Sequence, residues 1–218
     1  MISERRFRLL GALSGIAGVA MLMLSFATAV GPPAGATSAD MVKFGHQHFA
    51  AILWGAWLQA VGPVFIILFA LSLVHTAGAM HHLAGWMTLF GSTVLMTVSL
   101  IEITFYMSAM FPDPPLMPVV SMRVINAVQH LYFNVAAPSL FFPLGTVLLN
   151  SRILPRLFGY TALMLAGIFA TLGVIFLLSL TLPAAVTAFA AVQAIWWLAA
   201  ACAFAIGSKR LGQTQSDA

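Results

Sequence analysis

The sequence predicts an all-α fold, a polytopic membrane helix bundle of six transmembrane helices with both termini cytoplasmic. Hydrophobic residues make up 61% of the 218 residues and charged residues only 6%, against roughly 25% charged residues in an ordinary soluble domain. No Asp, Glu, Lys or Arg occurs between Lys43 and Glu102, or between Arg156 and Lys209. A soluble fold of this size could not bury so much apolar surface, so these observations exclude a water-soluble globular protein.

Turn-forming residues divide the chain into six pieces that can each cross a bilayer, which takes about 20 apolar residues. The breaks are the Gly31-Pro32-Pro33 turn, the histidine-rich residues 75–82, the proline-rich residues 112–115, residues 150–155 and Thr181-Leu182-Pro183. The expected spans are residues 7–30, 48–74, 83–111, 119–149, 157–180 and 184–207. Residues 1–218 therefore form a single integral membrane domain.

The basic residues predict the orientation of these spans. Six spans bring both termini to one side of the membrane, and that side receives seven of the nine bases. These are Arg5, Arg6, Arg8, Arg152, Arg156, Lys209 and Arg210. Because Lys and Arg are enriched in cytoplasmic loops, we expect a multi-pass protein of the inner (cytoplasmic) membrane. The same asymmetry accounts for the net charge of +4 without a nucleic-acid partner.

The N-terminal span has an alternative interpretation. Three arginines precede its apolar run, and Ala34-Gly35-Ala36 resembles a signal-peptide cleavage site. Cleavage there would leave five spans. The apolar run is longer than the core of a signal peptide, usually about 7 to 15 residues, which favours a retained helix.

Four strongly polar residues lie deep inside the expected spans. Glu102 lies about 14 Å from the outer end of the third span, at 1.5 Å of rise per residue. Gln59 and His130 lie about 17 Å from the same face, and Gln193 about 14 Å. An ionisable group at the centre of a transmembrane helix costs at least about 2.5 kcal/mol, so it needs a partner or a function. The matched depths predict a polar pocket that opens to the outer side.

Helical spacing adds further polar residues to this pocket. One stripe along the fourth span consists of Arg123, Asn126, His130 and Asn134. On the second span His48 shares a face with Gln59, and on the third span Tyr106 shares a face with Glu102. We expect Arg123 near the mouth of the pocket, where it could pair with Glu102. The structural alternative is that these side chains only crosslink helices.

Three segments of the second to fourth spans stand out together. They are His48 with Leu53-Trp54-Gly55, Phe105-Tyr106-Met107-Ser108, and Ala137-Pro138-Ser139-Leu140-Phe141. With these segments the chain resembles the haem-dependent membrane enzyme styrene oxide isomerase. The resemblance implies that His48 ligates haem b, whose iron acts as a Lewis acid on an epoxide, and that Tyr106 helps to bind or polarise the substrate. The chain departs from that four-helix, trimeric family in having two more spans, and Trp54 where the family has asparagine.

The leading hypothesis is therefore a membrane enzyme, a haem-dependent isomerase or oxidoreductase, that acts on a small apolar molecule. In it His48 is the metal ligand, Glu102 and His130 exchange protons, Tyr106 donates a hydrogen bond and Arg123 orients the substrate. The expected contacts to the cofactor are His48, Gln59, Asn126 and Asn134. The alternatives are a small proton- or ion-coupled transporter and a non-catalytic subunit of a membrane complex. A homo-oligomer is compatible with each of these functions.

Overall fold

The computed structural model describes residues 4–28, 35–110, 117–178 and 183–216. Within these ranges it describes all side chains except those of residues 110, 117–119, 122, 126, 176–178, 183–187 and 208–216. The described chain contains helices and no strands, which confirms the all-α prediction. The elements are α1 (Glu4–Thr28), α2 (Ser38–Gln47), α3 (Phe49–Thr76), η1 (Ala79–His81), α4 (Leu83–Met110), α5 (Met117–Leu131), η2 (Tyr132–Ala136), α6 (Ala137–Asn150), α7 (Arg156–Leu178) and α8 (Pro183–Ser216).

Six helical segments are long and apolar enough to cross a membrane, as the sequence predicted. They are Glu4–Thr28, Phe49–Thr76, Leu83–Ala109, Arg123–Asn150, Arg156–Ile175 and Ala188–Gly207. The fourth segment joins the end of α5, the π-helical turn η2 and α6. The expected span ends at residues 30, 111 and 180, and Ala34 of the candidate cleavage site, lie outside the described residues. The chain is therefore a multi-pass membrane protein.

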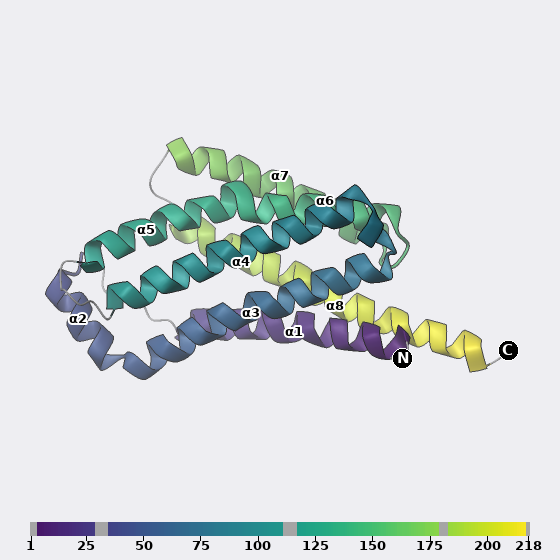
Figure 1. Ribbon diagram of the computed structural model, residues 1–218, viewed down its shortest axis with the longest axis horizontal. Helices are drawn as coiled ribbons and strands as arrows, with labels where there is room; N and C mark the ends of the chain where they lie inside the picture. Colours follow the sequence, from purple (N-terminus) through teal and green to yellow (C-terminus); the bar gives the residue numbers. More distant parts are fainter. Residues whose placement is uncertain (1–3, 29–34, 111–116, 179–182, 217–218) are drawn as a thin grey trace.

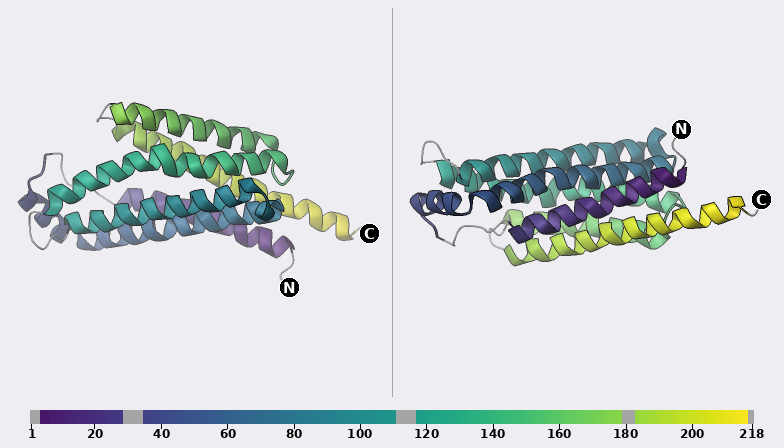
Figure 2. Two further views of the ribbon diagram at one scale, coloured as in Figure 1. Left: turned by 45° about the horizontal axis from the view of Figure 1, so that its top comes forward. Right: turned by 90° about the horizontal axis from the view of Figure 1, so that it is seen from below.

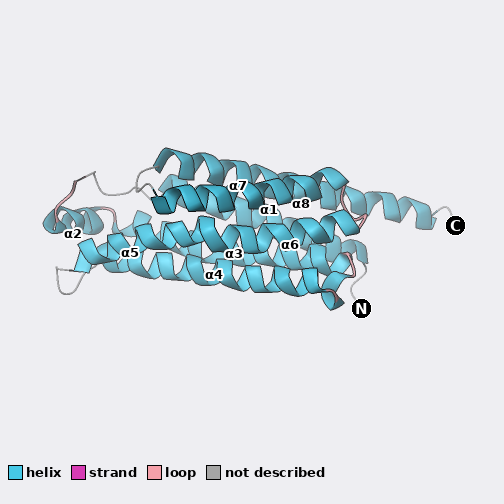
Figure 3. Cartoon of the chain, turned by 90° about the horizontal axis from the view of Figure 1, so that it is seen from above, coloured by secondary structure: helices cyan, strands magenta, loops and turns pink. Residues whose placement is uncertain are grey.

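The two chain ends lie at the same end of the bundle, and α2 lies at the opposite end (Figures 1 and 3). The basic N-terminal turns of α1 and α7 are also at the terminal end. There Arg8 forms an ion pair with Glu4 at 3.1 Å, and its guanidinium lies 5.5 Å from the centre of the Phe204 ring. The fold thus gathers these bases at one end, as the charge pattern indicated, while the identity of that side as cytoplasmic stays a prediction.

Glycines allow α1 to approach α3 closely. A Cβ atom on Gly18 would lie 2.9 Å from the carbonyl oxygen of Gly62, and one on Gly15 would lie 2.7 Å from the Phe69 ring. Small residues are common at helix crossings in membranes. Burying apolar side chains gives little free energy there because the lipid is equally apolar, so close packing of the backbones stabilises the contact instead. As a result α1 lies between α3 and α8 (Figure 2, right).

Aromatic side chains fill the space between α6, α7 and α8. Phe141 and Trp197 are fully buried with their ring centres 5.3 Å apart, and Phe169 of α7 lies 6.1 Å from Phe189 of α8. The indole nitrogen of Trp196 donates a hydrogen bond of 2.9 Å to the hydroxyl of Thr161. Bulky rings therefore hold α8 against α7 where the backbones are not in close contact.

Helix α2 was not expected, because the sequence interpretation placed residues 31–47 in a loop. It begins with a capping box, in which the Thr37 hydroxyl accepts from the backbone N–H of Asp40 at 3.2 Å and Asp40 accepts from the backbone N–H of Thr37 at 3.0 Å. The spacing of Thr37 and Asp40 is the signature of such a helix start. This signal was present in the sequence and was missed.

We predict that Gly91→Ala destabilises the bundle. A Cβ atom at Gly91 would collide with the backbone of Ser139 in α6, and overpacking of this kind typically costs about 1–3 kcal/mol. The matched control is Gly167→Ala, because nothing lies within 4 Å of the added Cβ atom at that position. Thermal unfolding in detergent should show a lower midpoint for the first variant only. Equal midpoints would contradict the close crossing of α4 and α6.

The capping box predicts a pH dependence of α2. Hydrogen bonds from the Thr37 hydroxyl and backbone N–H, together with the charge of Lys43, hold the pKa of Asp40 below its ordinary value of 3.8. The cap is therefore fully formed above the ordinary pKa and is lost as the pH falls through the lowered one. A carbon-13 NMR titration of the Asp40 carboxyl should show the pKa rising toward 3.8 in Thr37→Val. An unchanged titration would remove Thr37 as its cause.

Candidate functional site

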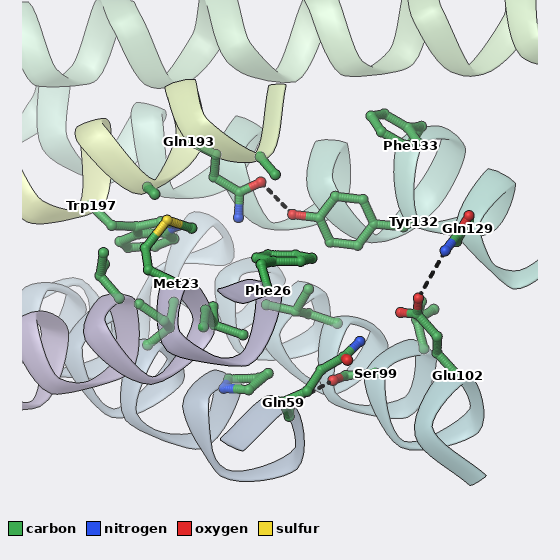
Figure 4. A pocket seen from close by; sticks show the side chains of 18 residues that line it. Met23, Phe26, Gln59, Ser99, Glu102, Gln129, Tyr132, Phe133, Gln193 and Trp197 are labelled. Carbon is green, nitrogen blue, oxygen red and sulfur yellow. Dashed lines mark hydrogen bonds between the residues drawn. The ribbon is translucent and has the colours of Figure 1, made fainter. Parts of the chain in front are cut away.

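A cavity of about 150 Å³ lies among six elements of the bundle (Figure 4). Its walls come from α1, α3, α4, α5, η2 and α8, and most of the lining side chains are apolar. The polar lining residues are Gln59, Ser99, Glu102, Gln129, Tyr132 and Gln193. Glu102 lies seven residues before the end of its span at Ala109, about 10 Å deep at 1.5 Å per residue. The cavity thus occupies the half of the membrane nearer to α2.

Glu102 is held by amide side chains. The Nε2 group of Gln129 donates a hydrogen bond of 3.1 Å to Oε1 of Glu102, and the amide of Gln59 approaches the same carboxyl group (Figure 4). The Ser99 hydroxyl donates to the main-chain carbonyl of Gln59 at 3.2 Å, which joins α4 to α3. The carboxyl group therefore has neutral partners in these contacts.

A second polar pair lies across the cavity from Glu102. The hydroxyl of Tyr132 donates a hydrogen bond to Oε1 of Gln193, which links η2 to α8 (Figure 4). Tyr132 begins the π-helical turn, and such turns shift the helical register of the residues that follow. The ring of Tyr132 packs edge-on against Phe133 and Phe169. These contacts fix the position of its hydroxyl group.

Two side chains of α1 both line the cavity and lie on the outer surface of the bundle. They are Phe26 and Met23, which are 59% and 38% exposed. Helix α8 lines the cavity with the small residues Ala190 and Ala194. Because Phe26 and Met23 belong to a membrane-spanning helix, their exposed parts face the lipid.

The structure brings together three of the four polar residues that were expected at one depth. Gln59, Glu102 and Gln193 all line the cavity, whereas His130 is half-buried outside the lining. Gln129, one residue earlier on α5, lines the cavity instead. The face of α5 that reaches Glu102 is therefore rotated by about 100° about the helix axis from the face that was expected. Glu102 and the exposed Arg123 form no ion pair.

The other expected residues of the fourth span lie elsewhere. Asn134 packs against α7, where its side chain fills the space that a Cβ atom on Gly173 would need. The side chain of Asn126 is outside those that the structure describes. Sequence reasoning missed Gln129 and Tyr132. Gln129 was recognisable as a strongly polar residue within the span, but the inward face was assigned from the spacing around His130.

The two residues singled out by the family resemblance lie nearer to α2 than the cavity does. Tyr106 and Phe44 both pack against a small apolar cluster that includes Ile52, and the buried Tyr106 hydroxyl has no hydrogen-bond partner among the described residues. His48 joins α2 to α3, and its exposed ring lies 4.4 Å from that of Phe44. Neither His48 nor Tyr106 lines the cavity, although Tyr106 lies only one helical turn beyond Glu102 on α4.

Among the described residues, the surroundings of His48 do not enclose a space that would fit haem. The exposed ring of His48 is not enclosed as an axial ligand in a haem pocket would be, and the described lining of the cavity offers no imidazole or thiolate. The described residues also contain no group of three or more His, Cys, Asp or Glu side chains placed to hold a metal ion. Haem b therefore stays a prediction of the resemblance.

Comparison of the chain with known protein families, with curated proteins and with solved structures finds no match.

We predict a measurable coupling between Tyr132 and Gln193. Tyr132→Phe and Gln193→Leu each remove one partner of their hydrogen bond, and such bonds between membrane helices contribute about 0.6 kcal/mol on average and up to about 1.7. A double-mutant cycle of unfolding free energies in mixed detergent micelles measures the coupling. Tyr160→Phe is the control, because Tyr160 is exposed on α7. Additive effects of the two substitutions would contradict the bond.

Proposed function

We propose that this integral membrane protein binds a small, largely apolar molecule in the cavity, with Glu102 and Gln193 as polar anchors. The observation that carries the proposal is a largely apolar cavity within the membrane-spanning bundle, with two hydrogen-bonded polar pairs in its lining. Pockets for small molecules typically combine an apolar lining with a few placed polar groups. The cavity among these helices has that composition.

The size of the cavity limits the ligand. A dry cavity of about 150 Å³ in a soluble protein binds benzene, and this cavity has a similar volume. The lining residues Phe26 and Met23 are also exposed on the outer surface of α1, so a ligand that extends beyond the cavity would do so beside them, toward the lipid. We therefore expect a single-ring compound or a short branched chain.

The two polar pairs can orient such a ligand. Because Gln193 accepts from Tyr132 through Oε1, its amide N–H groups can still donate to a ligand. Because each carboxylate oxygen can accept more than one hydrogen bond, Glu102 can accept from a ligand as well as from Gln129. A molecule with one polar group would therefore bind in a defined orientation, either toward Gln193 or toward Glu102.

A proton-coupled carrier is the second candidate, and the shapes of the helices around the cavity favour it. Pro63 interrupts the hydrogen bonding inside α3, η2 is a π-helical turn, and both line the cavity. Transporters commonly bind their substrates between interrupted helices. A carrier requires the same binding site, so the test of binding comes first.

We predict that fluorobenzene binds to the protein in phosphatidylcholine nanodiscs. Its fluorine-19 NMR line should broaden with the wild-type protein, and the broadening should be lost in Ala194→Phe, because the new ring would fill the cavity. Ala199→Phe is the matched control, because Ala199 lies on the exposed face of α8 outside the lining. Equal broadening with all three proteins would show partition into lipid alone and contradict the proposal.

A further inference from the structure

We infer that the ligand of this cavity is a lipophilic amine that binds as its ammonium ion, with Glu102 as the counter-ion. This inference rests on the proposed function and names its substrate class. It depends on how the charges around Glu102 are arranged, on the aromatic side chains that line the cavity, and on the lining side chains that are also exposed to the lipid.

The first step is the charge balance of the cavity. Glu102 and Tyr132 are the titratable residues among the described lining, and neither supplies a positive charge. Around them, Tyr106 lies one turn further along α4, while His130 and Arg123 belong to α5 outside the lining. The walls from α1, α3 and α8 contribute no titratable side chain to the described lining. The site therefore has a carboxyl group and no resident cation.

The second step is the cost of that arrangement. A carboxylate within the membrane is stabilised by a nearby positive charge more than by a neutral amide, because an amide donates a hydrogen bond but brings no opposite charge. The contacts of the Glu102 carboxyl group are with the neutral amides of Gln129 and Gln59. An ammonium group at Glu102 would add the opposite charge that these contacts do not supply.

The third step concerns the body of the ligand. Phe26 lies between the wall that carries Tyr132 and Gln193 and the wall that carries Gln59 (Figure 4). Aromatic faces attract organic cations as well as apolar groups. A ring with an aminomethyl group would place its nitrogen at Glu102 and its ring among these side chains.

The fourth step is access to the site. The neutral form of a lipophilic amine dissolves in the bilayer, and the lining residues Phe26 and Met23 are also exposed on the outer surface of α1, where the lipid lies. When the neutral amine meets a protonated carboxyl, the proton moves from the oxygen of Glu102 to the amine nitrogen. The products are an ammonium and a carboxylate, so the net charge inside the membrane does not change.

The test compares 4-fluorobenzylamine with 4-fluorobenzyl alcohol, a neutral analogue of nearly the same shape. Both are titrated by fluorine-19 NMR into wild-type protein and Glu102→Gln in phosphatidylcholine nanodiscs, with empty nanodiscs as the background. We expect Glu102→Gln to weaken amine binding about tenfold or more, because an ionic hydrogen bond is lost. Alcohol binding should change much less.

The outcomes separate the two proposals. If neither compound binds to the wild-type protein, the proposed function fails. If the alcohol binds and the amine has no advantage that depends on Glu102, the function stands and the inference about amines is wrong. Retained alcohol binding in Glu102→Gln shows that this variant is folded.

A second measurement does not depend on the folding of that variant. The infrared difference spectrum of the wild-type protein should show carboxylate formation, or an altered carboxylate band, when the amine is added and not when the alcohol is added. Glu102→Asp keeps the charge and should retain part of the preference for the amine. An identical infrared response to the two compounds would overturn the inference.

Discussion

A carboxyl group inside a bilayer must find its polar partners within the protein, because the hydrocarbon offers none. Glu102 is in this situation, and the Gln129 amide at 3.1 Å is the contact that satisfies it. That contact requires α5 to present Gln129 to α4. Hydrogen bonds from Ser99 to α3 and from Tyr132 to α8 connect the surroundings of Glu102 to these two helices.

The cavity results from two different modes of helix packing. Glycines bring α1 close to α3, whereas large rings and the hydrogen bond from Trp196 to Thr161 connect α8 with α7. The close contact of α1 with α3 and the aromatic rings between α7 and α8 leave a space beside Ala190 and Ala194 of α8. A cavity at a crossing of this kind can persist, because the rings that surround it are rigid and already in contact with one another.

The sequence predicted the six spans well, because apolar runs between turn-forming residues are a direct consequence of bilayer thickness. It also predicted that Gln59, Glu102 and Gln193 converge, because depth along a helix can be counted from its end. It did not reveal the face of α5 that turns inward. Spacing around His130 defines a stripe, but the rotation of that stripe about the helix axis depends on the neighbours.

What the sequence determined by itself was the helical class, the division into spans and the depth of the polar residues, since these follow from hydropathy and the rise per residue. The tertiary structure decided which polar groups meet. Gln129 rather than His130 faces Glu102, Asn134 turns to Gly173, and Tyr132 reaches Gln193. The physical reason is that such contacts depend on the rotation of each helix about its axis, on the π-helical turn and on the close approach of helices at glycines. These features are fixed jointly by side chains from segments that are distant in the sequence.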